Sequence, residues 1–504
     1  MVKTWKGNLL SLKLHSFAKA NNKYVEYSSS EFIQKIKIAA DHVENYLDES
    51  VHGKGRVISQ PKAEDLAADL RIEQWIREGG MDDQDINDFL PTYLENSMHM
   101  HHPQYIGHQV AVPHLASGIA DFIHGAINNP MAIYEMGPSS SVIEQSIINW
   151  MLEKVGWFKG NHLTDFRDIE GNGGGIMTHG GSLANLTALL AARAHISPDS
   201  WDQGTDSDLV VIGSEVAHYS ILRSISIMGL GKKALVAVET DKNEVLDVSK
   251  LRNVISECRN KGKRIMAIIA NACATSTGLY DPIDEIGSLC NEENIWYHVD
   301  GAHGASALLH DKISPLMNGT RKANSLIWDT HKMLRTTTLS AAVLFRKSEE
   351  MNATFQQKGS YLFHEKEEPG FDLMSYTVEC TKVPMATKLC WVLGAMGEKG
   401  LGDYVYGRYA LTRDIYNLLN QEEDFYCPYV PEANIICFLY KGGQEGNEFQ
   451  LALRNLIIKR GNFYITSTEV SRVRYLRLTV INPHTDLNHI RGLIEEIRTC
   501  AKLL

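Results

Sequence analysis

Short apolar runs alternate with helical patterns along the middle of the chain. Five runs of branched and aromatic residues have the length of buried strands: 208–214, 264–273, 295–301, 324–330 and 340–348. Helical segments between them predict a mostly parallel sheet with helices on both faces, and therefore an α/β fold. The last run adds a further strand, for which an antiparallel direction is open.

The regions around these strands have patterns of their own. Residues 1–105 are polar with helix-like spacing and predict an N-terminal helical segment, whereas 106–385 predict a large α/β domain. Residues 386–504 mix strand and helix signals, which predicts a small α+β C-terminal domain. Ser141 is expected to be the N-cap of a helix, with Glu144 as its capping-box partner.

Composition narrows the function classes. The chain has 504 residues and a net charge of −11, which argues against a general nucleic-acid binder. Its 8 cysteines form no CxxC pair and fit a reducing cytoplasm. No apolar stretch of about 18 residues predicts a membrane span. The run "HMHH" lacks a carboxylate or cysteine partner, so no metal site is expected.

Polar residues follow the predicted strands at the points where the strands end. Thr275, Asp300 and His218 each come after one strand, and His331 with Lys332 come after another. In open α/β sheets, ligands bind beyond the carboxyl ends of the strands. We therefore expect these side chains to converge on one edge of the sheet.

A Gly-Gly-Ser turn opens a long predicted helix. Gly180 and Gly181 allow close approach of backbone N–H groups, Ser182 adds a hydroxyl, and the helix directs its positive end at the same place. Such a turn suits a phosphate or another anion, although a lone Gly-Gly-Ser is more often only a tight turn and N-cap. Neither a P-loop nor a Rossmann fingerprint is present.

Each of these residues alone has a common structural explanation, but the combination indicates a particular kind of site. Asp300 alone fits a turn, Lys332 a surface position and His218 a helix cap. An anion cradle combined with an imidazole, a carboxylate and a primary amine describes a site for pyridoxal 5′-phosphate. In such a site a lysine forms a Schiff base, and an aspartate keeps the pyridine nitrogen protonated.

At these positions the chain resembles the group II pyridoxal-phosphate-dependent amino-acid decarboxylases. The resemblance rests on "WYHVDGAHGAS" and "NSLIWDTHKML", and on "HHPQYIGHQ", "GGSLAN", "AHYS" and "LRLTVINPHTDLNHI". It implies the pyridoxal-phosphate-dependent transferase fold (fold type I) and a homodimer with active sites at the interface. It also implies decarboxylation of an L-amino acid to an amine and CO2, through an internal aldimine and a quinonoid intermediate.

The resemblance assigns the residues around the cofactor ring. Lys332 matches the lysine that forms the Schiff base, and Asp300 matches the aspartate at the pyridine nitrogen. Ala302 matches the small residue on one ring face, and His218 matches the histidine stacked on the other face. Thr275 matches a threonine near the polar edge of the ring.

The same resemblance assigns the phosphate site and the substrate pocket. Gly181, Ser182 and His331 match phosphate ligands, Arg477 matches an arginine that grips a substrate carboxylate, and His108 matches the pocket wall. In relatives a tyrosine of a mobile segment donates the proton. Tyr376 is the candidate for this role, and Tyr361 in the charged stretch 356–376 competes with it.

Several departures leave alternatives open. Asp329 stands where many relatives carry asparagine, and an acid beside a phosphate repels it unless it faces away or pairs with a cation. His303 replaces a large aromatic residue. An acidic, aromatic, branched or diamino acid could be the substrate. Rival functions are an aldehyde synthase, a transaminase or lyase on the same fold, and a non-catalytic binding protein.

Overall fold

The structure is a computed structural model that describes residues 26–159, 171–352, 354–355 and 372–504. It divides into two compact units. The first combines Met1–Tyr105 with Leu456–Tyr464, and the second combines Ile106–Asn455 with Ile465–Leu504.

The first unit is helical, as the polar N-terminal pattern predicts. Its helices are α2 (Ser29–Val51), α3 (Ala63–Asp69), α4 (Ile72–Arg77) and α5 (Asp83–Glu95). Ser28 caps α2 in a capping box with Glu31, and Asp82 caps α5 in the same way with Asp85. These caps fix where the two helices begin, because they satisfy N–H groups that have no partner within the helix.

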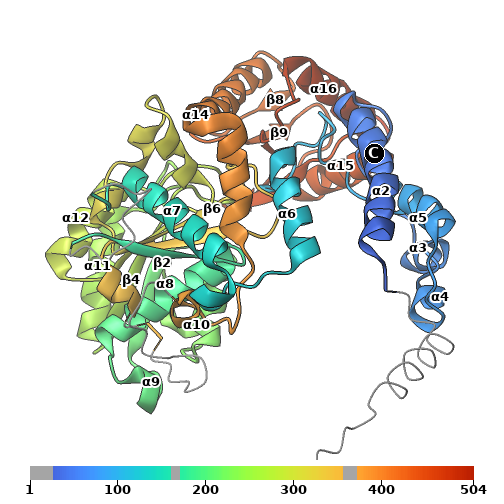
Figure 1. The fold of residues 1–504 in the computed structure, drawn as a ribbon. Coiled ribbons are helices and arrows are strands. Elements are labelled where there is room, and N and C mark those ends of the chain that lie inside the picture. The colour runs from blue at the N-terminus through green and yellow to red at the C-terminus, as the bar shows by residue number, and fades with distance from the viewer. Residues whose placement is uncertain (1–25, 160–170, 353, 356–371) are drawn as a thin grey trace, which may run out of the picture. The chain divides into compact units, whose positions relative to one another are not determined.

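A seven-stranded sheet forms the centre of the second unit (Figure 1). In spatial order its strands are β1 (Gly174–Thr178), β7 (Ala341–Phe345), β6 (Ser325–Asp329), β5 (Tyr297–Asp300), β4 (Arg264–Asn271), β2 (Leu209–Ser214) and β3 (Leu235–Val238). All five strands predicted from the sequence are present, within a few residues of the predicted ends.

The strand directions put most carboxyl ends at one edge. Strands β6, β5, β4, β2 and β3 are parallel, and β7 runs antiparallel to both β6 and β1. The sheet is therefore mostly parallel, and the last predicted strand is the antiparallel one. The segments that follow β1, β2, β4, β5 and β6 all leave the sheet at the same edge.

Helices cover the sheet on both faces, since every residue of β1, β2, β5, β6 and β7 is buried (Figure 1). The remaining helices are α6 (Leu115–Ile127), α7 (Pro138–Val155), α8 (Gly181–Ile196), α9 (Ser200–Gln203), α10 (Tyr219–Ile227), α11 (Val248–Asn260), α12 (Ile283–Glu293), α13 (Ser348–Asn352), α14 (Met385–Asn420), α15 (Asn447–Arg460) and α16 (Leu487–Ala501).

The C-terminal part carries a second, smaller sheet. Its order is β10 (Thr466–Val470), β11 (Val473–Thr479), β9 (Ile435–Tyr440) and β8 (Phe425–Tyr426), all antiparallel. Helix α14 contacts both α16 and this sheet. The mixed strand and helix signals at the C-terminus thus correspond to real elements, while a separate domain from residue 386 stays a prediction.

The expected N-cap of α7 is wrong. The helix begins at Pro138, whose fixed φ suits the first helical position, with Gly137 as the N-cap. Ser141 is fully buried inside the helix, and Glu144 does not close a capping box. Glu144 Oε1 instead accepts a hydrogen bond from the Met177 amide of β1 at 3.0 Å and lies 3.3 Å from Lys382 Nζ.

The Glu144–Lys382 pair joins three segments in the interior. Both side chains are buried, and Lys382 also donates to the carbonyl of Met177. Burial raises the pKa of Glu144, while Lys382 and the Met177 amide oppose that rise. The pair therefore ties α7 and the segment before α14 to β1, the strand that leads into the Gly-Gly-Ser turn.

Removing one partner of this pair should destabilise the protein strongly. We expect Lys382→Met to lower the free energy of unfolding by about 3–5 kcal/mol, because a buried carboxylate loses its cation. Adding Glu144→Gln should recover part of the loss. Urea denaturation of the cofactor-free protein measures both effects. Lys399→Met, at a side chain that is 89% exposed, is the control and should change the free energy of unfolding little. An equally small change in Lys382→Met would contradict a stabilising role of the buried pair.

Candidate active site

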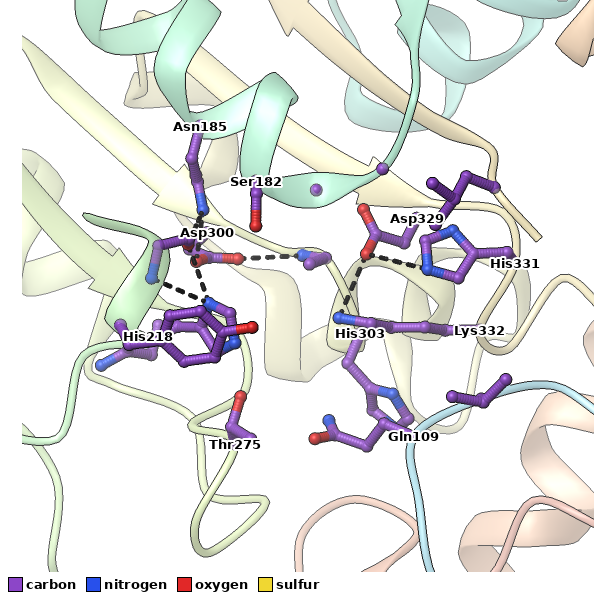
Figure 2. Close-up of a pocket in the computed structure, with 18 of the residues that line it drawn as sticks. Gln109, Ser182, Asn185, His218, Thr275, Asp300, His303, Asp329, His331 and Lys332 are labelled. Carbon is purple, nitrogen blue, oxygen red and sulfur yellow. Dashed lines mark hydrogen bonds and ion pairs between the residues drawn. The ribbon is translucent and has the colours of Figure 1, made fainter. Parts of the chain in front are cut away.

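The carboxyl edge of the large sheet borders a cavity of about 410 Å³. Figure 2 shows Asp300 and His218 on one side of this space and Lys332, Asp329 and His331 on the other. The residues around it include most of those predicted from the sequence: Gly181, Ser182, His218, Thr275, Asp300, Ala302, His303, Asp329, His331 and Lys332.

Lys332 lies just beyond β6 and pairs with the last residue of that strand. Its Nζ is 3.1 Å from Asp329 Oδ2, and the side chain is 17% exposed. Asp329 is buried, so the carboxylate keeps the lysine close to the cavity rather than in solvent. A primary amine held in this way is available to react with a carbonyl group bound in the cavity.

His331 points its second nitrogen toward the same carboxylate. Its Nδ1 is 2.6 Å from the carbonyl of Ser340, which can only accept, so Nδ1 carries a proton. Nε2 lies 3.8 Å from Asp329 Oδ2 (Figure 2). The ring is thereby fixed with Nε2 on the side of the Gly-Gly-Ser turn.

Asp300, at the end of β5, is held by an amide from α8. Asn185 Nδ2 donates to Asp300 Oδ2 at 3.0 Å, and the backbone N–H of Ala302 approaches Oδ1 at 3.3 Å. Asp300 is 7% exposed and lines the cavity. The carboxylate can therefore accept a further hydrogen bond from a ring nitrogen in the cavity.

The same network sets the protonation of His218, the N-cap of α10. Its Nδ1 accepts from the Ser220 amide at 3.3 Å and lies 2.8 Å from Ser220 Oγ, which in turn accepts from Asn185 at 2.9 Å. Burial lowers the pKa of His218, and Asp300 opposes this shift. The neutral ring thus carries its proton on Nε2, which it can offer as a donor.

A second buried histidine fixes the amide orientation of Asn185. His298 Nε2 is 2.9 Å from Asn185 Oδ1, and His298 Nδ1 is 2.8 Å from Ser325 Oγ. Burial lowers the pKa of His298 to about 4, so the ring is neutral. With Nε2 donating to the amide oxygen, the amide nitrogen of Asn185 must face Asp300.

The Gly-Gly-Ser turn begins α8 directly opposite Asp329. Gly180 is the N-cap with a φ of +92°, a conformation that favours glycine. A Cβ on Gly181 would lie 2.7 Å from Asp329 Oδ1, so a larger residue does not fit. Ser182 lines the cavity one residue later. Backbone N–H groups and a hydroxyl at a helix N-terminus are suited to bind a phosphate.

The residues present fit pyridoxal 5′-phosphate. An amine, a buried carboxylate across the cavity, a histidine on the same side as that carboxylate and a helix N-terminus supply each of the contacts that the cofactor needs. The cavity volume is in the range of small-molecule sites.

Comparisons with known proteins agree with this geometry. Residues 77–441 match the family described as the pyridoxal-dependent decarboxylase conserved domain. This chain belongs to the pyridoxal-dependent decarboxylases. Its cofactor is pyridoxal 5′-phosphate and its reaction is the decarboxylation of an amino acid, so the predictions of family, fold class and reaction are confirmed.

Individual relatives span nearly the whole chain. The acidic amino acid decarboxylase GADL1 of Homo sapiens is 26% identical over 96% of this chain and 92% of its own length. The aromatic-L-amino-acid decarboxylase of Bacillus atrophaeus is 27% identical over 91% and 94%. The apo structure of mouse CSAD has a TM-score of 0.83 at 23% identity, covering 93% of this chain and 99% of that chain, which shows a shared fold.

Neither predicted substrate residue of this decarboxylase, Arg477 or His108, is among the described residues that line the cavity. Arg477 is buried, and its Nη2 donates to the carbonyl of Thr275 at 2.7 Å and to Gln109 Oε1 at 3.0 Å. Gln109 lines the cavity, whereas the neighbouring His108 is exposed. Arg477 therefore reaches the cavity through the amide that it orients, and its direct grip on a substrate stays a prediction.

The two tyrosine candidates differ in what the structure describes. Tyr376 ends the 3-10 helix Leu373–Tyr376, is half-buried and packs against the core of the large sheet. It is not among the described residues that line the cavity. Tyr361 lies outside the described residues, so the choice of proton donor stays a prediction.

The polar residues that hydrogen-bond to Asp300 and His218 and orient them were missed from the sequence. Asn185, Ser220 and His298 orient Asp300 and His218; each lies in a stretch that carries the family resemblance, but none was assigned a role. One signal was available: His298 and Asp300 are two apart on a strand and so share a face. Asn185 follows Gly181 by four residues, which puts both on one side of α8.

His303 is buried beside the cavity in a neutral form. Its Nε2 is 2.6 Å from Asn434 Oδ1, and burial lowers its pKa to about 3. The imidazole thus fills the position as an uncharged polar group, and it must stay uncharged for the fold to be stable.

The two neutral histidines should make the protein sensitive to acid. His298 and His303 have folded-state pKa values of about 4 and about 3, below the usual 6.5. Their contribution to stability is present above about pH 6.5 and falls as the pH decreases toward the folded values, by about 1.4 kcal/mol per pH unit for each histidine. Urea midpoints at pH 7.5 and 5.5 should differ less in His303→Gln than in the wild type. His52→Gln, at an exposed side chain, should leave the difference unchanged.

Proposed function

We propose that this decarboxylase acts on a small acidic L-amino acid, with Lys332, Asp300 and His218 as its catalytic groups. When bound, pyridoxal 5′-phosphate supplies an electron-accepting ring for the electrons that the departing carboxylate leaves on Cα. The proposal rests on one observation: the amine, the carboxylate and the neutral imidazole border one cavity at the carboxyl edge of the sheet.

Each group has a defined task at a defined atom. Lys332 Nζ is the amine that would hold the cofactor, and its pairing with Asp329 keeps it at the cavity. Asp300 keeps a proton on the pyridine nitrogen, because Asn185 fixes the carboxylate in a buried place where a cationic partner is favoured. Ala302 packs against the ring, and Gly181, Ser182 and His331 bind the phosphate. Thr275 borders the polar edge of the ring.

His218 orients the bond that breaks. Its Nε2–H is the donor that the network leaves available, and it suits a hydrogen bond to the substrate carboxylate. Such a hydrogen bond would orient the carboxylate that leaves as CO2. Tyr376 is our candidate for returning a proton to Cα after the carboxylate has left.

Positive charge near one end of the cavity favours an acidic substrate. The Arg477 guanidinium is buried beside Gln109, which lines the cavity. Arg477 Nη2 holds Gln109 by its oxygen, so the amide nitrogen of Gln109 is left as a donor beside the cavity. An N–H donor backed by a guanidinium matches a side-chain carboxylate. The human relative is named as an acidic amino acid decarboxylase.

Substitution of Gln109 tests the substrate class. In a panel of acidic, aromatic, branched and diamino acids, we expect the wild type to release CO2 and the matching amine in equal amounts from an acidic member. Gln109→Leu should raise KM for that substrate about tenfold or more with little change in kcat, because a ground-state contact is lost.

Two further variants serve as controls for this panel. Gln109→Glu has the same size but adds a negative charge, so its KM for acidic substrates should rise more than that of Gln109→Leu. Lys332→Ala should lose the cofactor's visible absorbance and all turnover. Release of aldehyde, ammonia and peroxide would favour an aldehyde synthase. A preference for an aromatic substrate that Gln109→Leu does not change would contradict the proposed pocket.

We further propose that two copies of this chain associate through α6. One face of α6 presents an exposed apolar stripe at helical spacing: Leu115, Ile119, Phe122, Ile123 and Ile127. The opposite face holds the 337–340 segment, where the Thr337 amide donates to Ser117 Oγ at 2.8 Å. Leu339 of this segment lines the cavity and is 49% exposed. A second copy on the apolar stripe would therefore be separated by α6 from a segment that lines the active site.

An acidic residue in the apolar stripe should break this association. We expect the wild type to sediment as a dimer and Phe122→Glu to sediment as a monomer at the same protein concentration, because a charge cannot be buried there without a partner. Val473→Glu, at an exposed apolar residue on another part of the surface, should stay dimeric. A wild type that sediments as a monomer would contradict the proposal.

We assign the protein to the cytoplasm on the state of its cysteines. All 8 cysteines are free thiols, as expected in a reducing compartment. Among the residues that the structure describes, no helix has the length and apolar content needed to cross a bilayer.

A further inference from the structure

Asp329 is a buried carboxylate with one oxygen unused. It ends β6 and is 2% exposed. Its Oδ2 faces Lys332 Nζ at 3.1 Å and His331 Nε2 at 3.8 Å, whereas Oδ1 has no hydrogen-bond partner in the described part of the chain. A buried carboxylate oxygen without a donor is costly, so a function is to be expected at this atom.

Both oxygens of Asp329 face the start of α8. A Cβ built on Gly181 would lie 2.7 Å from Oδ1 and 2.8 Å from Oδ2. Gly181 and Ser182 are the residues to which the proposed function assigns the phosphate. The chain therefore places a negative charge of its own within contact distance of its anion site (Figure 2).

We propose that Asp329 weakens the hold on the cofactor's phosphate and couples phosphate binding to the uptake of a proton from solvent. This inference rests on the proposed phosphate site at Gly181 and Ser182. A phosphate dianion and a carboxylate repel each other strongly in a site from which water is excluded. A proton shared between Oδ1 and a phosphate oxygen removes one negative charge and turns the repulsion into a hydrogen bond.

Lys332 does not cancel this repulsion in the loaded enzyme. As a free ammonium group it pairs with Asp329 Oδ2, but its nitrogen is then committed to the bond with the cofactor. His331 is the other cation-forming group at the carboxylate. The remaining titratable groups that line the cavity in the described part of the chain are His179, which pairs with Glu379, and His218, Tyr219, Cys273, Asp300 and His303.

Calorimetry with pyridoxine 5′-phosphate tests the inference. This compound has the cofactor's phosphate and ring but no aldehyde, so its binding does not depend on bond formation with Lys332. We expect Asp329→Asn to bind it about tenfold or more tightly than the wild type near pH 8. The difference in affinity between the two proteins should narrow toward about pH 6, because binding that takes up a proton strengthens as the pH falls. Titrations in buffers of different ionisation enthalpy should show about one proton more taken up by the wild type than by the variant.

Two comparisons separate the possible causes. The same pair measured in the Lys332→Ala background shows whether the effect acts through the lysine, and the affinity gap should persist there. Asp403→Asn, an equal change of net charge at an exposed residue, should leave the affinity unchanged. Asp329→Asn is isosteric, and circular dichroism of the cofactor-free protein confirms that it folds.

The outcomes distinguish this inference from the proposed function. Equal affinity and equal proton uptake in the wild type and in Asp329→Asn would overturn the role of Asp329 alone. A gap that vanishes in the Lys332→Ala background would also overturn it, because the effect would then come from the lysine's charge. No binding of pyridoxine 5′-phosphate to either protein would overturn both this inference and the phosphate site.

Discussion

The hydrogen bond from Asn185 to Asp300 is the contact on which the rest of the site depends. It crosses from α8 to the end of β5 and lets a carboxylate stay buried at 7% exposure. Neutral His298 donates a hydrogen bond to the oxygen of the same amide. Ser220 Oγ accepts a hydrogen bond from the amide nitrogen and lies against His218 Nδ1, so the amide also orients His218. One side chain therefore fixes both the carboxylate proposed to face a ring nitrogen and the imidazole proposed to face the substrate.

The order of strands explains why these residues meet. The parallel strands β2, β4, β5 and β6 deliver the segments that follow them to one edge, and β1 brings the start of α8 to the same place. Strand β7 runs the other way and contributes Ser340 just before its first residue, where the carbonyl of Ser340 sets the tautomer of His331. These side chains are thus spread over 154 residues of sequence, from His179 to Lys332, and border one cavity of about 410 Å³.

Much of this arrangement could be predicted from the sequence because the site residues come directly after strands that are recognisable as apolar runs. Asp300, His331 and Lys332 each follow a strong apolar run, so their convergence needs only the rule that parallel strands share an edge. Strand β1 was missed because it is five residues long and begins with two glycines, and β3 because only one of its four residues is buried. Asn185, Ser220 and His298 were missed because each takes part in hydrogen bonds between separate elements of the fold.

Covalent labelling can identify the lysine that bonds to the cofactor. Borohydride reduction of the protein loaded with pyridoxal 5′-phosphate, followed by peptide mass spectrometry, identifies the residue bonded to the cofactor. The account predicts a single stable adduct on the peptide that contains Lys332, formed by the wild type and by His218→Asn but not by Lys332→Ala. An adduct on Lys388 or Lys382, or labelling that survives Lys332→Ala, would contradict it.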